Sequence, residues 1–389
     1  MRMTGKNHSL KTARIKDVAE LDPETLGEST DPNFSFKYID LSAVKGGRIG
    51  DQVESMTFAG APGRARKLIK EGDVLLGMVR PYLKPFAKVQ RALGVHVAST
   101  GFAVIRARSG VTDPEYLYQT IWSDGISKQI HQMVTGSSYP ALSVGDVKDL
   151  KIPLPPLAEQ RKIAEILRTW DEAIETAEAE LKAKQTLHQG LLQRAFSQGE
   201  CIAAGGGKPL GEVVTLVKGK KPELYNEQFN GAAPYLVARF IRGEEAPKFA
   251  AQSDKNAVRV VASDIVIICD GSNSGEMFTG LDGVLSSTMA KLIPVSSDFE
   301  KAYIRYFVGY NGLRLSEAQE GGAIPHLDRE KLLNFRIPML EKKEQEVVVE
   351  RLNASERAVQ FVKQRTELLR TQKRGLMQKL LTGEVRVAV

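Results

Sequence analysis

An internal repeat is the feature that most constrains how this chain can fold. The segment PALSVGDVKDLKIPLPPLAEQRKIAEIL is matched later by PHLDREKLLNFRIPMLEKKEQEVVVERL. The offset between the copies is fixed at 185, as in Pro140 and Pro325 (325 − 140) or Gly190 and Gly375 (375 − 190). Such a fixed register over a long stretch indicates one structural unit used twice. The sequence therefore predicts a tandem duplication.

Upstream of this stretch the repeat continues more loosely. EGDVLLGMV resembles ASDIVIICD, and GVHVASTGFAVIRA resembles GVLSSTMAKLIPV, with offsets that drift as small loop insertions would produce. The segments between Ala19 and Lys67 and between Leu216 and Asn256 show no convincing match. A shared scaffold that carries two different recognition segments would have this pattern.

A heptad pattern of apolar residues follows each globular part. Such a pattern predicts a long helix whose apolar seam packs as a coiled coil. About 40 residues at ~1.5 Å each would give a rod roughly 60 Å long. His188 and Lys373 interrupt the seam at equivalent positions, where polar residues commonly fix register and partner. The predicted seam comprises Ile163, Leu167, Trp170, Ile174, Leu181, Leu191, Val348, Leu352, Val359, Val362, Leu369 and Leu376.

The predicted fold class is α+β, with two strand-rich domains separated by an antiparallel two-helix coiled coil. Short β-branched runs such as DVLLGMV, FAVIRA, DIVIICD and AKLIPV predict the strands. Like units are expected to pack about an approximate two-fold axis, so the second helix should run antiparallel to the first. The predicted parts are residues 1–152 (first domain), 153–200 (first helix), 201–336 (second domain) and 337–389 (second helix and C-terminal tail).

Length and composition fit a two-core protein with a polyanionic partner. The 389 residues are too many for one ordinary core. No apolar run is long enough for a membrane span, so we expect no membrane partner. The lone cysteines Cys201 and Cys269 suit a reducing cytoplasm, the predicted location. The net charge of +7 is uneven: residues 1–152 carry 21 Lys+Arg against 16 Asp+Glu, whereas residues 201–336 carry 16 of each.

Motifs for catalysis are missing from the sequence. No GxxxxGK[ST] loop and no Asn/Asp-Pro-Pro-Tyr/Phe methyltransferase motif occurs, and FAGAPG is only a weak glycine pattern. The five histidines are not spaced as zinc ligands, which predicts no metal site. We therefore expect a chain without a catalytic centre.

The sequence resembles the specificity subunits of type I restriction-modification systems over essentially its whole length. The most specific motifs are KIPLPPLAEQRKIAEIL with its echo FRIPMLEKKEQEVVVERL, and the helix ends GLLQRAFSQGE and GLMQKLLTGE. In the second copy Met339 and Leu340 replace the later prolines, so we expect a less sharply defined start of the second helix.

That resemblance implies a function and a set of partners. Each of two target recognition domains would contact one half of a split, asymmetric site in double-stranded DNA, and the helices would set the spacing and dock two methyltransferase subunits. The chain would be a non-catalytic subunit of a restriction endonuclease and adenine methyltransferase complex. It would bind no cofactor itself, with S-adenosylmethionine held by the methyltransferase. Restriction subunits would be a further partner.

Candidate DNA contacts are basic, hydroxyl or amide side chains on Gly- and Pro-rich segments, where arginine can reach guanine edges or phosphates and asparagine can pair with adenine. A solvated loop or a plain turn is the alternative for each. The segments are GAPGRARK, VRPYLKPF, TGSSYP, VKGKKPELY, ARFIRG and DGSNSGE. The candidate residues are Arg48, Arg64, Arg66, Lys67, Arg80, Tyr82, Lys84, Ser138, Tyr139, Lys218, Lys220, Lys221, Arg239, Arg242 and Asn273.

Two other functions stay open at this point. A coiled-coil scaffold or adaptor would bind proteins through its globular ends and show no salt-dependent retention of DNA. A stand-alone, two-headed DNA-binding regulator would bind a specific site without partners. The specificity-subunit interpretation predicts steep salt dependence, because neutralised phosphates release counterions.

Overall fold

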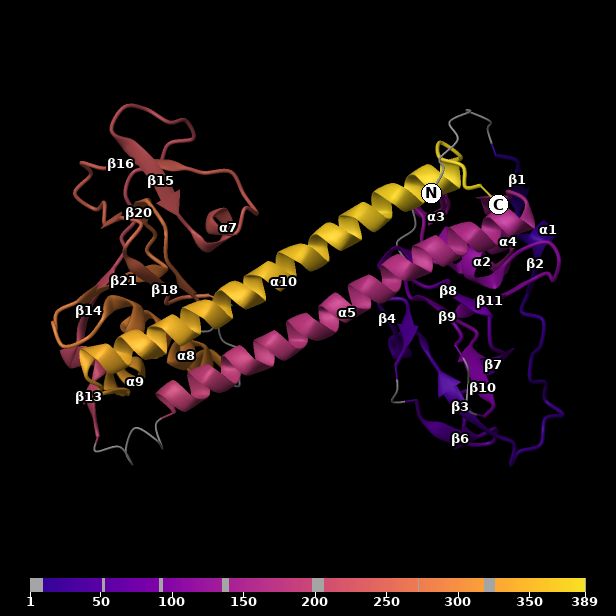
Figure 1. Ribbon diagram of the computed structural model, residues 1–389, viewed down its shortest axis with the longest axis horizontal. Helices are drawn as coiled ribbons and strands as arrows, with labels where there is room; N and C mark the ends of the chain where they lie inside the picture. The colour runs from indigo at the N-terminus through magenta and orange to yellow at the C-terminus, as the bar shows by residue number, and fades with distance from the viewer. Residues whose placement is uncertain are drawn as a thin grey trace. The chain divides into compact units, whose positions relative to one another are not determined.

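The computed structural model describes residues 10–50, 53–90, 94–134, 140–197, 206–271, 273–317 and 326–388, apart from the side chains of 313–317. The chain divides into two compact units. Unit 1 comprises Met1–Glu178 with Gln364–Val389, and unit 2 comprises Ala179–Lys363. Each unit therefore contains one strand-rich domain and a half of each long helix. Figure 1 labels the two long helices and many of the strands and short helices of both units.

Unit 1 contains two four-stranded sheets with helices on one side. One sheet has the strand order β2-β11-β8-β9 and the other the order β6-β3-β10-β7. The strands are β2 (Ala19–Leu21), β3 (Ser35–Ile39), β6 (Ser55–Thr57), β7 (Ala65–Ile69), β8 (Val74–Gly77), β9 (Phe86–Lys88), β10 (His96–Ser99) and β11 (Phe102–Ala107). Smaller elements are β1 (Thr12–Arg14), α1 (Ile15–Val18), η1 (Leu41–Ala43), β4 (Val44–Lys45), β5 (Arg48–Ile49), η2 (Pro81–Leu83), α2 (Pro114–Ile121), α3 (Asp124–Val134), α4 (Val144–Asp149) and β12 (Lys151–Pro153).

Strand β8 shows why the layers form. Its side chains alternate between the two faces of the sheet, as in any strand. Val74 and Leu76 pack against Leu117 of α2 and Ile126 of α3, whereas Leu75 packs toward the other sheet. A strand buried on both faces needs a continuous apolar run, which the sequence DVLLGMV supplies.

Unit 2 repeats this arrangement. Its sheets have the orders β14-β21-β18-β19 and β16-β15-β20-β17. The elements are β13 (Gly207–Pro209), η3 (Leu210–Glu212), β14 (Val214–Lys218), β15 (Ala232–Leu236), α7 (Ala238–Ile241), β16 (Phe249–Ala251), β17 (Arg259–Val260), β18 (Ile265–Ile268), β19 (Met277–Phe278), β20 (Gly283–Leu285), β21 (Met289–Pro294), α8 (Lys301–Glu317), α9 (Arg329–Asn334) and β22 (Arg336–Pro338). Strand β18 corresponds to β8, with Ile265 and Ile267 facing one core and Val266 and Ile268 the other.

The pairing directions also agree between the units. The strands β3 and β10 pair in parallel, and so do their counterparts β15 and β20. The other pairs in the four-stranded sheets are antiparallel in both units. The duplication thus extends through β3 and β15, in the segments where the two sequences show no match. The predicted α+β class with a tandem repeat is confirmed.

The long helices are α5 (Leu157–Phe196) and α10 (Lys342–Thr382). Each follows a three-residue strand that ends in proline, β12 or β22. In unit 1, Arg386 beyond α10 pairs with Glu159, and Lys373 pairs with Asp171. Residues further along α5 thus pair with residues that come earlier in α10. These segments therefore run antiparallel, as predicted. In unit 2, Leu352 of α10 shares a core with α5 residues and with α8.

The twelve predicted seam residues lie on covered faces of these helices. Ile163, Leu167, Leu352 and Val362 are buried, and the other eight are half-buried. The polar interruptions Lys373 and His188 are half-buried as well. A few apolar side chains remain outside the seam, with Leu187, Phe361 and Leu368 exposed by 56%, 68% and 57%.

Candidate nucleic-acid interface

The bend between β8 and β9 places several predicted contacts on one rigid turn. Arg80 and Lys84 flank the turn η2 and both adopt left-handed backbone conformations, with φ of 47° and 51°. Non-glycine residues keep such angles only where their surroundings impose them. Here the Arg80 N–H donates to the Pro140 carbonyl at 2.9 Å, and the Lys84 N–H donates to the Pro81 carbonyl at 3.0 Å. Tyr82 at the tip is 56% exposed, so Arg80 and Tyr82 are accessible as predicted contacts.

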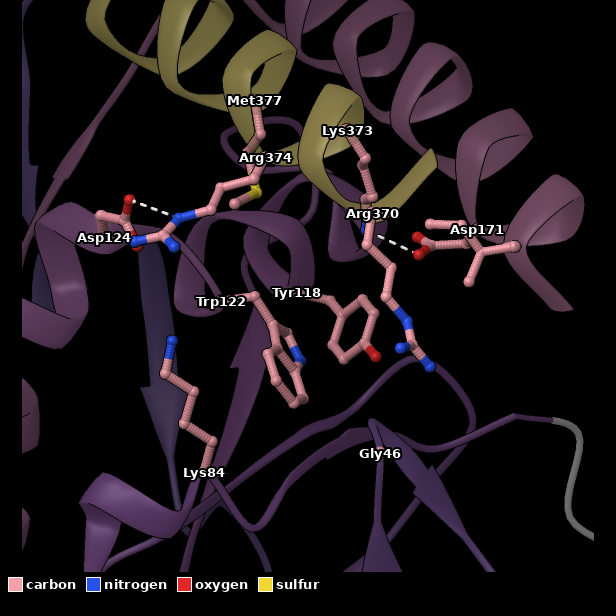
Figure 2. A pocket seen from close by; sticks show the side chains of 11 residues that line it. Gly46, Lys84, Tyr118, Trp122, Asp124, Asp171, Arg370, Lys373, Arg374 and Met377 are labelled. Atoms are coloured by element: carbon pink, nitrogen blue, oxygen red, sulfur yellow. Dashed lines mark hydrogen bonds and ion pairs between the residues drawn. The ribbon is translucent and has the colours of Figure 1, made fainter. Parts of the chain in front are cut away.

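Lys84 points inward from this turn. Its ammonium lies 5.8 Å from the centre of the Trp122 ring, and burial lowers its pKa. The two side chains line a cavity of about 390 Å³ with Tyr118 and residues of α5 and α10 (Figure 2). The lysine thereby fastens the turn to the end of α2. As a DNA contact it could act only from the rim of this cavity.

Other cations of the cavity are paired with carboxylates. Arg374 donates to Asp124 at 3.0 Å, and Lys373 donates to Asp171 at 2.6 Å, as the dashed lines in Figure 2 mark. These pairs join α10 to α3 and to α5. The arrangement therefore connects the helices of unit 1.

Unit 2 has an equivalent backbone bridge beside its own bend, but the residues that form it are polar. An isolated bridge joins Val79 to Ala141 in unit 1, and its counterpart joins Asp270 to His326. The carboxylate of Asp270 accepts from Lys218 at 2.9 Å and contacts His326 Nδ1 at 3.0 Å. Burial favours the protonated form of Asp270, but these two partners hold its pKa below the ordinary value. Lys218 is thus already paired.

The remainder of this bend in unit 2 is small and polar. Asn273 lies exposed on the turn that follows β18, and its backbone carbonyl accepts from the N–H of Glu276 at 3.1 Å. Ser138 and Tyr139, the predicted contacts in TGSSYP, lie outside the described residues.

The units differ at one further position, the connection between equivalent strands. Between β3 and β6 lies the hairpin β4–β5, whereas between β15 and β16 lies the short helix α7. Arg48 of the hairpin donates to Glu175 of α5 at 2.6 Å, and this carboxylate raises the pKa of Arg48. Arg242, directly after α7, pairs with Glu276. Arg239 lies on α7, and its Nε is 3.6 Å from Oε2 of Glu245.

Three predicted contacts, Arg64, Arg66 and Lys67, lie at and just before the start of strand β7, and the structure buries one of them. Lys67 is only 6% exposed, and its ammonium is bound by Asp22 at 2.8 Å and by the Phe102 carbonyl. A buried ion pair cannot reach DNA without unfolding the strand, so Lys67 is a structural residue. Arg64 is exposed and donates to the Tyr38 hydroxyl at 3.1 Å.

The remaining predicted contact, Arg66, is the second residue of β7 and is half-buried. Its guanidinium lies 4.8 Å from the centre of the Phe58 ring. This position holds the cation at the surface beside Arg64, two residues earlier.

Two predicted lysines of unit 2 point to solvent. Lys220 and Lys221 are exposed directly after Gly219. A Cβ at Gly219 would lie 2.1 Å from the Ser286 carbonyl oxygen, so only glycine permits this close backbone approach. The close approach of Gly219 to Ser286 fixes the point at which the two lysines leave the sheet.

Two kinds of residue were missing from the sequence prediction. Leu83, beside Tyr82, is 67% exposed, and the prolines Pro81 and Pro85 around an apolar pair were its available signal. Gln160 and Gln345 are buried and bind backbone atoms.

Among the described residues no group of three His, Cys, Asp or Glu side chains could hold a metal ion. No helix in the described part of the chain is long and apolar enough to cross a membrane.

Two copies of one α+β frame, each presenting different polar segments at the same positions, define a tandem-domain recognition protein. The family model for the type I restriction modification DNA specificity domain matches residues 9–184 and 207–371. Because these matches cover most of the sequence, the chain belongs to that family.

Individual relatives agree with this assignment. The specificity subunit of the type I restriction enzyme MjaVIII from Methanocaldococcus jannaschii is 33% identical over 177 residues, which are 45% of this chain and 41% of that relative. The putative MjaX specificity subunit of the same organism is 22% identical over 70% of this chain and 67% of its own length. In the MjaVIII alignment this chain spans less than half of the relative.

Solved structures extend the similarity over nearly the whole chain. A chain from a study of complex assembly and conformational transition of the type I R-M system is 25% identical, with a TM-score of 0.63 and coverage of 98% of this chain and 99% of that one. The S subunit of a type I restriction-modification system from M. genitalium is 13% identical, with a TM-score of 0.58 and 97% of both chains covered. The latter supports the fold alone.

Proposed function

We propose that this chain is the non-catalytic specificity subunit of a type I restriction-modification enzyme. Each unit contacts one half of a split, asymmetric site in double-stranded DNA. One observation carries the proposal: the two units share a strand order but differ in what they expose at the same two positions. The connection after β3 is a hairpin and that after β15 a helix. The bend after β8 is RPYLKP and that after β18 is DGSNSGE.

This distribution fits direct readout of two different half-sites. Phosphate contacts position a protein, and contacts to base edges specify the sequence. Arg64, Arg80, Lys220 and Lys221 are the exposed cations that we assign to DNA contact. Paired cations such as Lys218 and Arg242 would have to exchange a carboxylate for phosphate or base.

The long helices serve the protein partners in this proposal. Two methyltransferase subunits dock on α5 and α10, whose exposed apolar residues include Leu187, Phe361 and Leu368. Exposed large apolar side chains are common at protein interfaces. S-adenosylmethionine is bound by the methyltransferase and not by this chain. Restriction subunits are a further partner of the same assembly.

Methylation mapping tests the proposal. The chain is co-expressed with its methyltransferase subunit, and modified adenines in host DNA are mapped by sequencing. We expect one split motif, with different halves and a modified adenine in each. A complex that is assembled and active on DNA but yields no split motif would contradict the proposal. Failure to retain DNA at any salt concentration would favour the adaptor function instead.

A further inference from the structure

An exposed apolar tip projects from the basic turn of unit 1. Tyr82 and Leu83 are adjacent and are 56% and 67% exposed. Two adjacent large apolar side chains at the tip of a turn, next to an exposed arginine, form a small apolar surface that a partner can cover. The tip is therefore a candidate contact.

The turn that carries this tip is rigid. Its two ends are held by the left-handed residues Arg80 and Lys84, and the Leu83 N–H donates to the Arg80 carbonyl at 3.0 Å. Pro85 closes the turn against Gly77, where an added Cβ would lie 2.3 Å from Pro85 Cγ. A fixed turn can insert a side chain into a partner without ordering itself first.

The two residues of the tip are held differently. Tyr82 lines a hollow of about 170 Å³ together with Phe86, Ile130 and Val134. Leu83 does not line this hollow, and it is the more exposed of the two. Leu83 is therefore the leading residue, and Tyr82 stands behind it with its ring partly supported by α3.

We propose that Leu83 is a wedge that enters one base step of the half-site bound by unit 1, with Tyr82 stacked beside the opened step. This inference rests on the proposed function. Proteins that insert leucine, phenylalanine or similar residues unstack a base step and kink the duplex. The exposed cation Arg80 on one side of the tip suits a polyanion.

The repeat favours DNA over a methyltransferase subunit as the partner of this tip. A surface that docks the same subunit at both ends should be present in both units. The equivalent bend of unit 2, DGSNSGE, contains no large apolar residue. A feature that is present in one unit only is expected to contact a partner that differs between the two units. The two DNA half-sites differ in this way, whereas the two methyltransferase subunits are identical. The wedge should thus open a step in one half of the split site.

The test uses the complete methyltransferase complex and a duplex that contains its mapped site. The fluorescent base 2-aminopurine is placed in turn at each step of both halves, because its emission rises when it is unstacked. We expect a rise at one step in one half with the wild type and no rise with Leu83→Ser. Affinity for this duplex should fall about tenfold. Leu83→Met should behave as the wild type, because it keeps a large apolar side chain.

Two controls separate the possible outcomes. Val111→Ser removes another exposed apolar residue of unit 1 and should leave fluorescence and affinity unchanged. A mismatch at the wedged step should restore most of the affinity of Leu83→Ser, since the cost of unstacking is then already met.

Three results would overturn the wedge. The first is unchanged fluorescence and affinity of Leu83→Ser. The second is loss of the methyltransferase subunit from the Leu83→Ser complex on size-exclusion chromatography, which would assign the tip to a protein contact. The third is absence of site-specific binding by the wild type, which would reject the proposed function itself. The first two leave that function intact and reject the wedge alone.

Discussion

Gln160 and Gln345, 185 positions apart, make the same three hydrogen bonds in the two units. The side-chain oxygen of Gln160 accepts from the Asp113 N–H at 3.0 Å. Its amide nitrogen donates to the carbonyls of Val111 at 3.0 Å and Pro155 at 2.9 Å. One side chain thus joins the loop before α2, the end of the domain and the start of α5.

Gln345 repeats this set for the second helix. It accepts from the Glu300 N–H at 2.8 Å and donates to the carbonyls of Asp298 at 2.8 Å and Leu340 at 2.9 Å. The expectation that the second helix would start less sharply, for lack of the later prolines, was wrong. The glutamine fixes the helix start, and leucine supplies the same backbone carbonyl that proline does.

Removal of this side chain should destabilise each unit. In Gln160→Ala three backbone groups lose their partner, one in a buried bond to Pro155 and two in part-buried bonds, and leaving a buried group unpaired costs about 1–3 kcal/mol. We expect the free energy of unfolding in urea to fall by about 3 kcal/mol. Gln160→Glu can accept from Asp113 but cannot donate, so it should also be destabilised. Gln185→Ala, an exposed position on α5, is the control, and equal stability of Gln160→Ala and this control would contradict the prediction.

The two copies of the repeat are similar in sequence where particular side chains are needed. They are dissimilar where only backbone pairing is needed. Glutamine is needed at positions 160 and 345 because it is both donor and acceptor, so the motif survives. Strands β3 and β15 pair through backbone groups and need only apolar residues facing the core, such as Phe36 and Ala233. Very different side chains therefore build the same sheet, and only the structure shows the equivalence.

Charge in the sequence was a weaker guide to the surface that we propose for DNA. In the sequence, Lys67 and Lys84 cannot be distinguished from the neighbouring basic residues. In the structure, partners that are distant in sequence turn both side chains away from solvent. Asp22 binds Lys67 from 45 residues away, and Trp122 accommodates Lys84. Periodicity within one segment cannot indicate such partners. The Gly- and Pro-containing loop did single out Lys220 and Lys221, which follow the end of a strand and are exposed.

Lys67→Ala should therefore act on folding before it acts on DNA. It leaves the Asp22 carboxylate, itself only 16% exposed, without its cation. Breaking a buried pair by removal of one partner costs about 3–5 kcal/mol. We expect a correspondingly lower free energy of unfolding of the isolated chain, measured in urea. Lys67→Ala with wild-type stability and weakened DNA binding would show that the lysine contacts DNA after all.

Lys220→Ala and Lys221→Ala should have the opposite effects. Both side chains are exposed, so stability should change by less than about 0.5 kcal/mol. Each phosphate that is no longer neutralised should reduce the slope of log affinity against log salt by about 1. Titration of a fluorescent duplex by the assembled complex at several salt concentrations measures this slope. Lys343→Ala, an exposed lysine at the start of α10, is the control, and identical slopes for all variants would contradict the assignment.

His188 should make unit 2 less stable as the pH falls. Burial lowers the pKa of its imidazole, opposed by Glu356 and assisted by Arg305, and Nδ1 is buried without a hydrogen-bond partner among the described residues. A group whose pKa is lower in the folded state binds more protons when unfolded. Stability should thus be complete above the unfolded value of about 6.5 and decline as the pH falls from there toward the lower folded pKa.

The variant His188→Gln removes this titration. Urea unfolding at pH 7.5 and pH 5.5 should show a larger loss of stability for the wild type than for His188→Gln. Lys373→Gln changes the equivalent position of the repeat and should keep the wild-type dependence on pH, because His188 is still present. If the profiles of the wild type and His188→Gln run parallel between the two pH values, protonation of His188 does not oppose folding. The buried Nδ1 atom would then have to gain a partner, such as Glu356, when it is protonated.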